Sequence, residues 1–147
     1  MCPGATNAYA SLIAGSNIRA LFPAYTKDVD GDWWAKLRVP EDYNSSPAVK
    51  LRIGANSTAG QVTSFIVASI ARDTTAGWDA SALTAETVQD LTLQTTAYRP
   101  SDLTFTLSTT PVAGDDMLFK IQHNGTRTQD TLAVDSLLFQ AVFQYST

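Results

Sequence analysis

The chain has 147 residues, of which 44% are hydrophobic and 16% charged, a size and composition typical of one domain with a buried core. The 14 Asp and Glu residues outnumber 10 Lys and Arg, for a formal net charge of −4. The basic residues form no cluster, which excludes a nucleic-acid partner because binding to phosphates rests on basic side chains. Cys2 is the only cysteine, which excludes an intramolecular disulfide or a cysteine-based zinc site, and no apolar run reaches the roughly 18 residues of a membrane helix.

The N-terminal segment does not show the pattern of a targeting signal. Met1 to Asn7 lack a basic region followed by an apolar stretch, so we expect neither a secretory signal nor a lipoprotein anchor. Ala8 to Ala14 could form one short helical turn. We expect a looser N-terminal arm over residues 1–17, followed by a single domain over residues 18–147.

Alternation of apolar and polar residues with a period of two dominates the rest of the chain, and this is the pattern of a half-buried strand. It is clearest where Val49, Leu51 and Ile53 alternate with Lys50 and Arg52. The predicted strands are Trp33–Val39, Val49–Ile53, Val62–Ala71, Asp102–Ser108, Asp116–Gln122 and Leu138–Tyr145.

The segment Val62–Ala71 differs from the others because it is apolar or small almost throughout. Its β-branched residues favour a strand over a helix. We therefore expect this strand in the centre of a sheet, covered on both faces. The last predicted strand reaches almost to Thr147 and is expected to close the domain.

Turn-forming residues separate the predicted strands at the spacing expected of a sandwich or barrel. They include Asp30-Gly31-Asp32, Asn56 to Gly60, Pro111 to Asp116 and Asn124-Gly125. Ser81 to Asp90 could form one short helical turn. The whole pattern predicts an all-β fold, a jelly roll or β-sandwich of about eight antiparallel strands with a short N-terminal arm.

His123, the only histidine, follows a predicted strand and precedes the Asn124-Gly125 turn. A Ser-His-Asp arrangement would need this imidazole to face both a nucleophile and a carboxylate. No nucleophile-elbow motif surrounds any serine in the chain. We interpret His123 as an exposed turn residue, assign no catalytic residue and predict that the protein is not an enzyme.

Three acids, Asp28, Asp30 and Asp32, alternate along one predicted loop, and loop carboxylates are ligands that Ca²⁺ prefers. The calcium loop of an EF-hand would place a glycine directly after the third acid and a glutamate six residues further on. This chain has Trp33 and Val39 at those positions. We interpret the acids as a solvated turn, with a calcium site of another kind as the alternative, and predict no metal and no cofactor.

Two further acidic pairs lie in turn-like contexts, Asp115-Asp116 and Asp130 with Asp135. We interpret them as turn formers, because glycosidase carboxylates must face each other across a cleft. Asn44, Asn56 and Asn124 each begin a glycosylation sequon. Without an export signal we interpret these sequons as accidents of a composition rich in Ser, Thr and Asn.

Trp33 and Trp34 are adjacent, so in a strand their rings point to opposite faces. Two interpretations stay open. Either the sandwich buries both rings, or one of them, together with Trp78, lies in an interface or stacks on a sugar.

Two groups of residues resemble a recurrent jelly-roll domain of virion proteins from tailed bacteriophages. The first is the strand end Leu37-Arg38-Val39-Pro40-Glu41-Asp42-Tyr43, followed by an alternating strand and the turn Ala59-Gly60-Gln61-Val62. The second is Asp116 to Ile121, followed by Arg127, Asp130-Thr131-Leu132, Asp135 and Tyr145. The resemblance covers about Asp32 to Tyr145, and the four residues from His123 to Thr126, inserted before Arg127, depart from it.

The resemblance implies a protein that acts by binding. We expect a bacteriophage capsid decoration (cement) protein, made in the host cytoplasm and carried on the capsid surface of the virion. The expected partners are further copies in a homotrimer and the major capsid protein, with no nucleic acid and no membrane. The alternative is a tail-fibre or receptor-binding jelly-roll module that recognises host surface carbohydrate, and a hydrolase on the same scaffold ranks third.

Overall fold

The computed structural model describes residues 2–3, 8–14, 19–57, 60–73, 75 and 82–147. These residues contain no helix that could cross a membrane. Their strands are β1 (Cys2–Pro3), β2 (Ala8–Ala14), β3 (Arg19–Tyr25), β4 (Asp30–Arg38), β5 (Ser45–Ala55), β6 (Val62–Arg72), β7 (Thr84–Ala85), β8 (Gln89–Thr92), β9 (Ser101–Thr106), β10 (Asp116–Asn124) and β11 (Ser136–Ser146).

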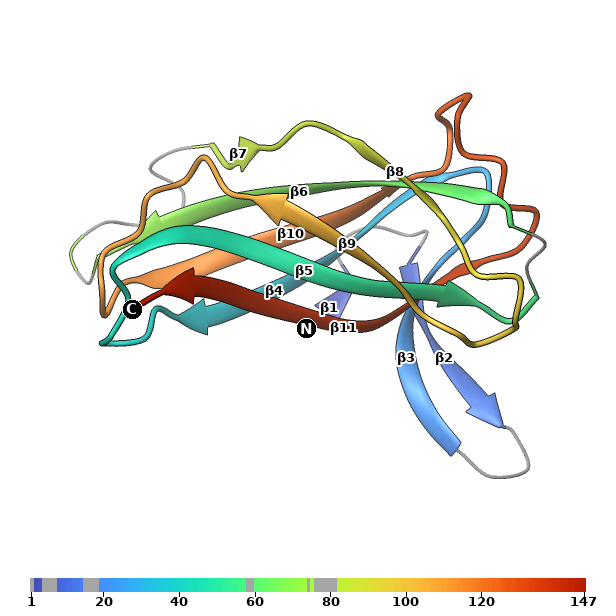
Figure 1. Cartoon of the computed structure of the whole chain (residues 1–147), viewed down its shortest axis with the longest axis horizontal. Coiled ribbons are helices and arrows are strands. Elements are labelled where there is room, and N and C mark those ends of the chain that lie inside the picture. The colour runs from blue at the N-terminus through green and yellow to red at the C-terminus, as the bar shows by residue number, and fades with distance from the viewer. Residues whose placement is uncertain (1, 4–7, 15–18, 58–59, 74, 76–81) are drawn as a thin grey trace.

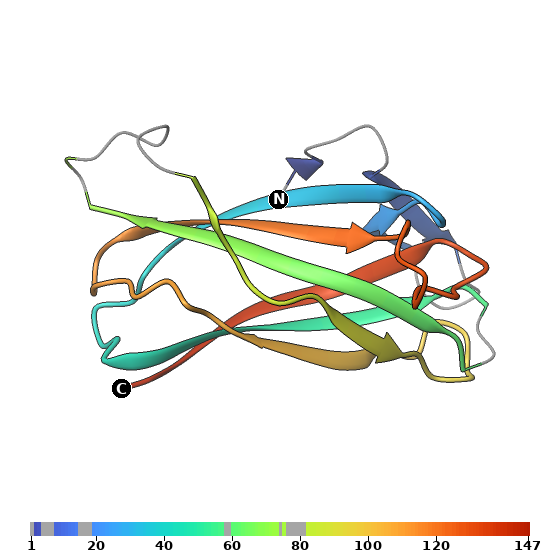
Figure 2. The same cartoon turned by 90° about the horizontal axis from the view of Figure 1, so that it is seen from above.

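The strands form two antiparallel sheets that pack face to face, as Figures 1 and 2 show. One sheet has the order β1-β4-β10-β6-β7, with β8 also paired to β6, and the other has the order β2-β3-β11-β5-β9. Without β1, β2 and β7, the orders become β4-β10-β6-β8 and β3-β11-β5-β9, so successive strands alternate between the sheets except for β6 and β8, which are neighbours in one sheet. This is the arrangement of an eight-stranded jelly roll, and the predicted all-β sandwich is confirmed.

The six strands expected from the alternating pattern are confirmed as β4, β5, β6, β9, β10 and β11. The prediction for Val62–Ala71 is also correct, because β6 has β10 on one side and both β7 and β8 on the other. Phe65 and Val67 point into the core, while Ala68 and Ile70 from the opposite face are buried as well.

Both predicted helical turns are wrong. Ala8–Ala14 is the strand β2, paired along its whole length with Arg19–Tyr25. The described part of Ser81–Asp90 includes β7 and the start of β8, both paired with β6, while Ser81 lies outside the described residues. Pairing with a neighbouring strand overrides weak local preferences of this kind.

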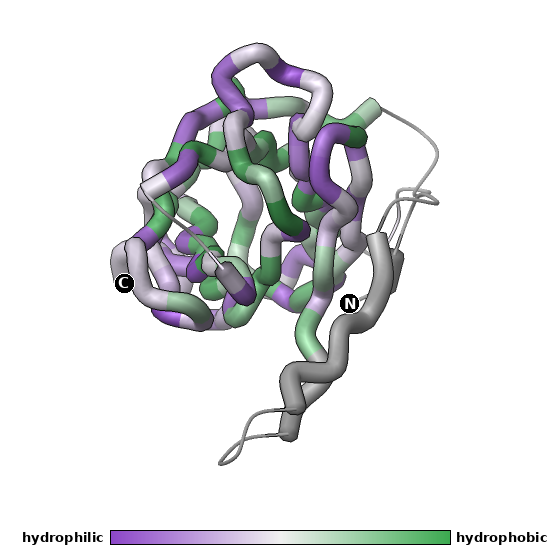
Figure 3. The backbone as a smooth tube through the Cα atoms, turned by 90° about the vertical axis from the view of Figure 1, so that its right-hand side faces the viewer, coloured by the Kyte–Doolittle hydropathy of each residue, from purple (hydrophilic) through white to green (hydrophobic). Residues whose placement is uncertain are grey.

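The core lies between the sheets and consists of inward-facing side chains from almost every strand. Figure 3 views the sandwich from one end, with the backbone running around this interior. The largest fully buried side chains include Tyr25, Phe65 and Phe105. The Tyr25 hydroxyl donates a hydrogen bond to the carbonyl oxygen of Ile121 at 3.1 Å, and burial, with a smaller effect of Asp32, raises the pKa of Tyr25 well above its ordinary value.

The two adjacent tryptophans have different surroundings. Trp33 belongs to the core, and its indole N–H donates to the carbonyl oxygen of Ala24 at 3.3 Å. Trp34 points to the outer face of the same sheet, in register with Lys120, and is half-buried. Trp78 lies outside the described residues. The interpretation that the sandwich fully buries both adjacent rings is therefore wrong.

Candidate functional site

His123 is not the exposed turn residue that we expected. Met117, Phe119 and Ile121 alternate inward along β10, and His123 continues the same phase, so its side chain is buried with an exposed fraction of 0%. Its ring packs against Phe65, with 5.3 Å between the ring centroids. Strand periodicity, rather than the adjacent turn, determines where this histidine points.

Asp130, from the loop between β10 and β11, is the hydrogen-bond partner of the buried histidine. Its Oδ2 lies 2.8 Å from His123 Nε2 and also accepts the Ser64 N–H at 2.8 Å and the Thr63 hydroxyl at 3.2 Å. Its Oδ1 accepts the Leu132 N–H at 3.3 Å. The side chain is 2% exposed, so the interpretation of Asp130 as a turn former misses its main role as a buried acceptor.

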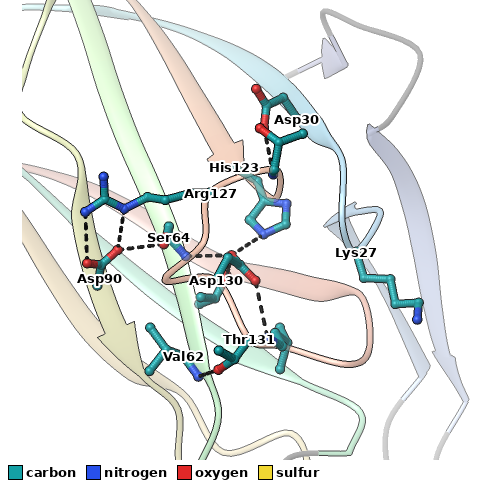
Figure 4. Close-up of polar contacts among 12 residues, drawn as sticks. Lys27, Asp30, Val62, Ser64, Asp90, His123, Arg127, Asp130 and Thr131 are labelled. Atoms are coloured by element: carbon teal, nitrogen blue, oxygen red, sulfur yellow. Dashed lines mark hydrogen bonds and ion pairs between the residues drawn. The ribbon is translucent and has the colours of Figure 1, made fainter.

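A second carboxylate, Asp90 of β8, extends this network toward the surface, as Figure 4 shows. Ser64 Oγ donates to Asp90 Oδ1 at 2.6 Å. The Arg127 guanidinium binds both carboxylate oxygens, at 3.1 and 3.2 Å, in the two-pronged geometry that favours arginine over lysine. The hydrogen bonds from Arg127 and then Ser64 lower the pKa of Asp90 below its ordinary value.

The Asp90 contacts predict a dependence of stability on pH. A lowered pKa in the folded protein means that the unfolded chain binds the proton more readily. The contribution of Asp90 is therefore fully present above the ordinary value of 3.8 and is lost as the pH falls through the folded value. We expect Asp90→Asn to destabilise the protein at pH 6 and to have much less effect at pH 2, as measured by urea unfolding across this range. Arg127→Gln removes the main cause and should flatten the same curve, so unchanged pH profiles in both variants would contradict this assignment.

The polar network does not form a nucleophile and base pair. Ser64 directs its hydroxyl to Asp90 and not to His123. Nδ1 of His123 is buried and has no hydrogen-bond partner, whereas a catalytic serine would have to contact the imidazole. We interpret the network as a clamp that joins the loop after β10 to β6 and β8, and call it the polar clamp, consisting of Ser64, Asp90, His123, Arg127 and Asp130.

Gly125, next to the polar clamp, has no room for a side chain. A glycine is required there for this reason and not because of its backbone angles. A methyl group at Gly125 would lie 2.5 Å from the Val29 carbonyl oxygen and 2.8 Å from the His123 ring. We expect Gly125→Ala to lower the free energy of unfolding by about 1–3 kcal/mol, measured by urea unfolding. Thr128→Ala changes an exposed residue of the same loop and should stay within about 0.5 kcal/mol. Equal stabilities of the two variants would contradict the close approach.

The three acids Asp28, Asp30 and Asp32, for which a calcium site was the alternative interpretation, make separate contacts. Asp28 lies 3.4 Å from Lys27, Asp30 accepts hydrogen bonds from the backbone and hydroxyl of Thr126, and Asp32 lies in register with Gln122. Within the described ranges, no group of three metal-ligating side chains comes together.

The other acids make local contacts. Asp115 accepts the Val112 N–H at 2.9 Å and forms the expected turn, while Asp116 pairs with Lys36 at 2.8 Å. Asp135 accepts the Lys27 N–H at 2.9 Å. The interpretation as a turn former holds for Asp115 but is wrong for Asp116, which begins β10 and pairs across to β4.

Two hollows are lined entirely by residues that the structure describes. An apolar cavity of about 180 Å³ lies between β4 and β11 and includes Leu37, Val49 and Phe143 in its lining. A smaller polar hollow of about 140 Å³ lies on β4 and β10, lined by Asp30, Gly31, Asp32, Lys120 and Gln122. Sequence alternation identifies which side chains point inward, but it does not show where the two sheets separate.

The residues behind the phage resemblance join distant parts of the chain. Arg127 and Asp130 belong to the polar clamp. Thr131 exchanges hydrogen bonds with the backbone of Val62, through its hydroxyl at 3.1 Å and its N–H at 2.9 Å. At the other end of the sandwich, the Tyr145 hydroxyl donates to Asp42 at 2.8 Å.

Comparisons with known proteins add no assignment, since neither a protein-family model nor a curated protein matches this chain.

Proposed function

We propose that this chain is a capsid decoration protein of a tailed bacteriophage, which binds the assembled shell of major capsid protein as a homotrimer. The observation that carries the proposal is the position of the residues that resemble the phage jelly-roll domain. Arg127, Asp130 and Thr131 hold the loop after β10 onto β6 and β8, while Asp42 and Tyr145 join the opposite end. Residues that fix both ends of a sandwich are those a recurrent domain needs in order to present its loops rigidly.

The mechanism is additive binding. Each copy that binds the assembled shell, but not the free shell subunits, stabilises the shell by mass action. A rigid jelly roll suits this task because binding does not require the loops to become ordered first.

Co-sedimentation with purified shells tests the proposal. We expect the full chain to pellet with mature shells that lack it, to saturate at a fixed ratio to the capsid protein, and to stay in the supernatant with unassembled capsid protein. Absence of binding to assembled shells, or equal binding to the unassembled protein, would contradict the proposed function.

One observation favours a second candidate, a module that binds host carbohydrate. Trp34 is half-buried on the outer sheet face, in register with Lys120, which also lines the polar hollow. An aromatic face beside polar groups is a common arrangement for binding sugars. Glycan-array binding that disappears in Trp34→Ala would support this candidate. Tyr98→Asn is the control, because Tyr98 is an exposed aromatic with a φ of 61°, an angle that asparagine tolerates.

A further inference from the structure

Two strand edges on the same side of the sandwich have no partner over most of their length among the strands that the structure describes. β3 lies beside β11 only at Ser136 and Leu137, and β1 lies beside β4 only at Trp33 and Trp34. Among the described strands, none pairs with that side of β11 after Leu137 or of β4 after Trp34. Such edges present unpaired N–H and C=O groups to which another chain can add.

The apolar cavity lies between these two edges. Leu37, Phe119 and Phe143 contribute apolar lining from both sheets. Lys36 is the charged residue among the described lining residues, and its Nζ lies 2.8 Å from the Asp116 carboxylate. The open side therefore combines unpaired backbone with an apolar interior, and a strand with few charges would fit it.

The hairpin of β2 and β3 has this chemistry. All seven residues of β2 pair with β3, and Figure 1 shows the hairpin pointing away from the sandwich. Arg19 is the only charged residue in the two strands. Ala24 and Tyr25 of β3 pair with β11 of the same copy, and the hairpin leaves β11 at Pro23. Proline has no N–H to donate to a neighbouring strand.

The open edge of β11 is longer than the part of β3 that would pair with it. Leu138 to Ser146 span nine residues with no partner on that side among the described strands. β3 offers the five residues from Arg19 to Pro23, roughly 17 Å at about 3.3 Å per residue, because Ala24 and Tyr25 already pair with β11 of their own copy. The acidic turn Glu41-Asp42 lies at the end of this edge, where Asp42 binds Tyr145. Glu41 is 80% exposed and lies 3.8 Å from the exposed side chain of Arg38, a weak contact that leaves its carboxylate accessible to a positive charge on an incoming chain.

We propose that the β2–β3 hairpin of one copy adds to the open β11 edge of the next copy and places Arg19 at the acidic turn. In this arrangement β3 runs antiparallel to β11 of the next copy. It has the same orientation where it pairs with β11 of its own copy. The contact is head-to-tail, and a head-to-tail contact that closes on itself gives a ring. The contact does not depend on binding to a capsid, but the number of three chains in the ring rests on the homotrimer of the proposed function.

Light scattering of the full chain and of a hairpin variant tests this contact. We expect a trimer for the natural chain and a threefold lower mass for Leu12→Lys with Ile13→Lys, with an unchanged circular dichroism spectrum that shows the sandwich still folded. The matched control is Thr128→Lys with Gln129→Lys, which adds the same charge on an exposed loop and should remain a trimer.

A charge exchange tests the orientation. Arg19→Glu should raise the dissociation constant of the trimer about tenfold or more. Adding Glu41→Arg to Arg19→Glu should restore most of the affinity, while Glu41→Arg alone should weaken it. Absence of any rescue would overturn the placement of Arg19 at the acidic turn.

Two results would overturn the proposed contact. One is a monomeric natural chain, and the other is an oligomer whose mass does not change in the hairpin variant. The natural chain could also be a monomer that still pellets with capsid shells. If the amides from Gln140 to Ser146 are then protected from hydrogen exchange only in the shell-bound protein, the capsid protein binds this edge. The contact between copies would then fail, while the proposed function would stand.

Discussion

Replacing Asp130 with alanine is expected to lower the free energy of unfolding by about 3–5 kcal/mol. The substitution leaves the His123 ring nitrogen, the Ser64 N–H and the Thr63 hydroxyl without their shared acceptor. All three residues are fully buried, so water cannot replace the lost hydrogen bonds without opening the loop. Urea unfolding followed by tryptophan fluorescence measures the change.

Two comparison variants make the Asp130 result specific. Glu41→Ala removes an exposed carboxylate that lies 3.8 Å from Arg38 and should change stability by less than about 1 kcal/mol. Asp130→Asn keeps the shape, but only one of its two terminal atoms can accept, so it should fall between alanine and the natural residue. An Asp130→Ala variant as stable as Glu41→Ala would show that the polar clamp contributes nothing to holding the loop.

Phe65→Ala should also cost about 3–5 kcal/mol. Phe65 is fully buried and packs edge-on against Tyr25, with 5.2 Å between ring centroids, and tilted against His123. The change would remove a core side chain and also one wall of the histidine environment. Val112→Ala, at a position 66% exposed, is the control and should stay within about 0.5 kcal/mol by thermal or urea unfolding. A loss below about 1 kcal/mol in Phe65→Ala would contradict the packing described for this end of the core.

Local pattern was sufficient to predict most of the sandwich. A strand with one buried face must alternate; β9 and β10 alternate over their whole length, and β5 alternates in its middle part. The pattern does not predict β3, because Pro23 interrupts its apolar run and proline weakens a strand assignment. β2 was missed for a related reason, since its identity depends on pairing with β3.

The polar clamp was only partly predictable. The inward phase of Met117, Phe119 and Ile121 extends to His123, and following that phase would have placed the histidine in the core. The contacts of the polar clamp are harder to predict because they join residues far apart in the sequence. Ser64 contacts Asp130 across 66 positions, and Arg127 contacts Asp90 across 37. Such pairs follow from the jelly-roll topology, and short-range periodicity carries no information about them.

Gly125 shows a different limit of local reasoning. Asn-Gly pairs usually signal a turn with positive φ, but Gly60 and Gly114 are the glycines with positive φ among the described residues. At Gly125 the missing side chain makes room for Val29, a residue distant in the sequence. The glycine is predictable as part of a turn, and its physical reason is not.

The heat stability of capsids, with and without this protein, tests the central claim most directly. Shells that lack the chain are heated in parallel with shells to which the purified protein has been added back, and release of packaged DNA is followed by dye fluorescence. The proposed function predicts release at a higher temperature when the protein is bound, with a shift that saturates once every binding position is filled. Identical release temperatures at saturating protein would contradict a role in stabilising the capsid.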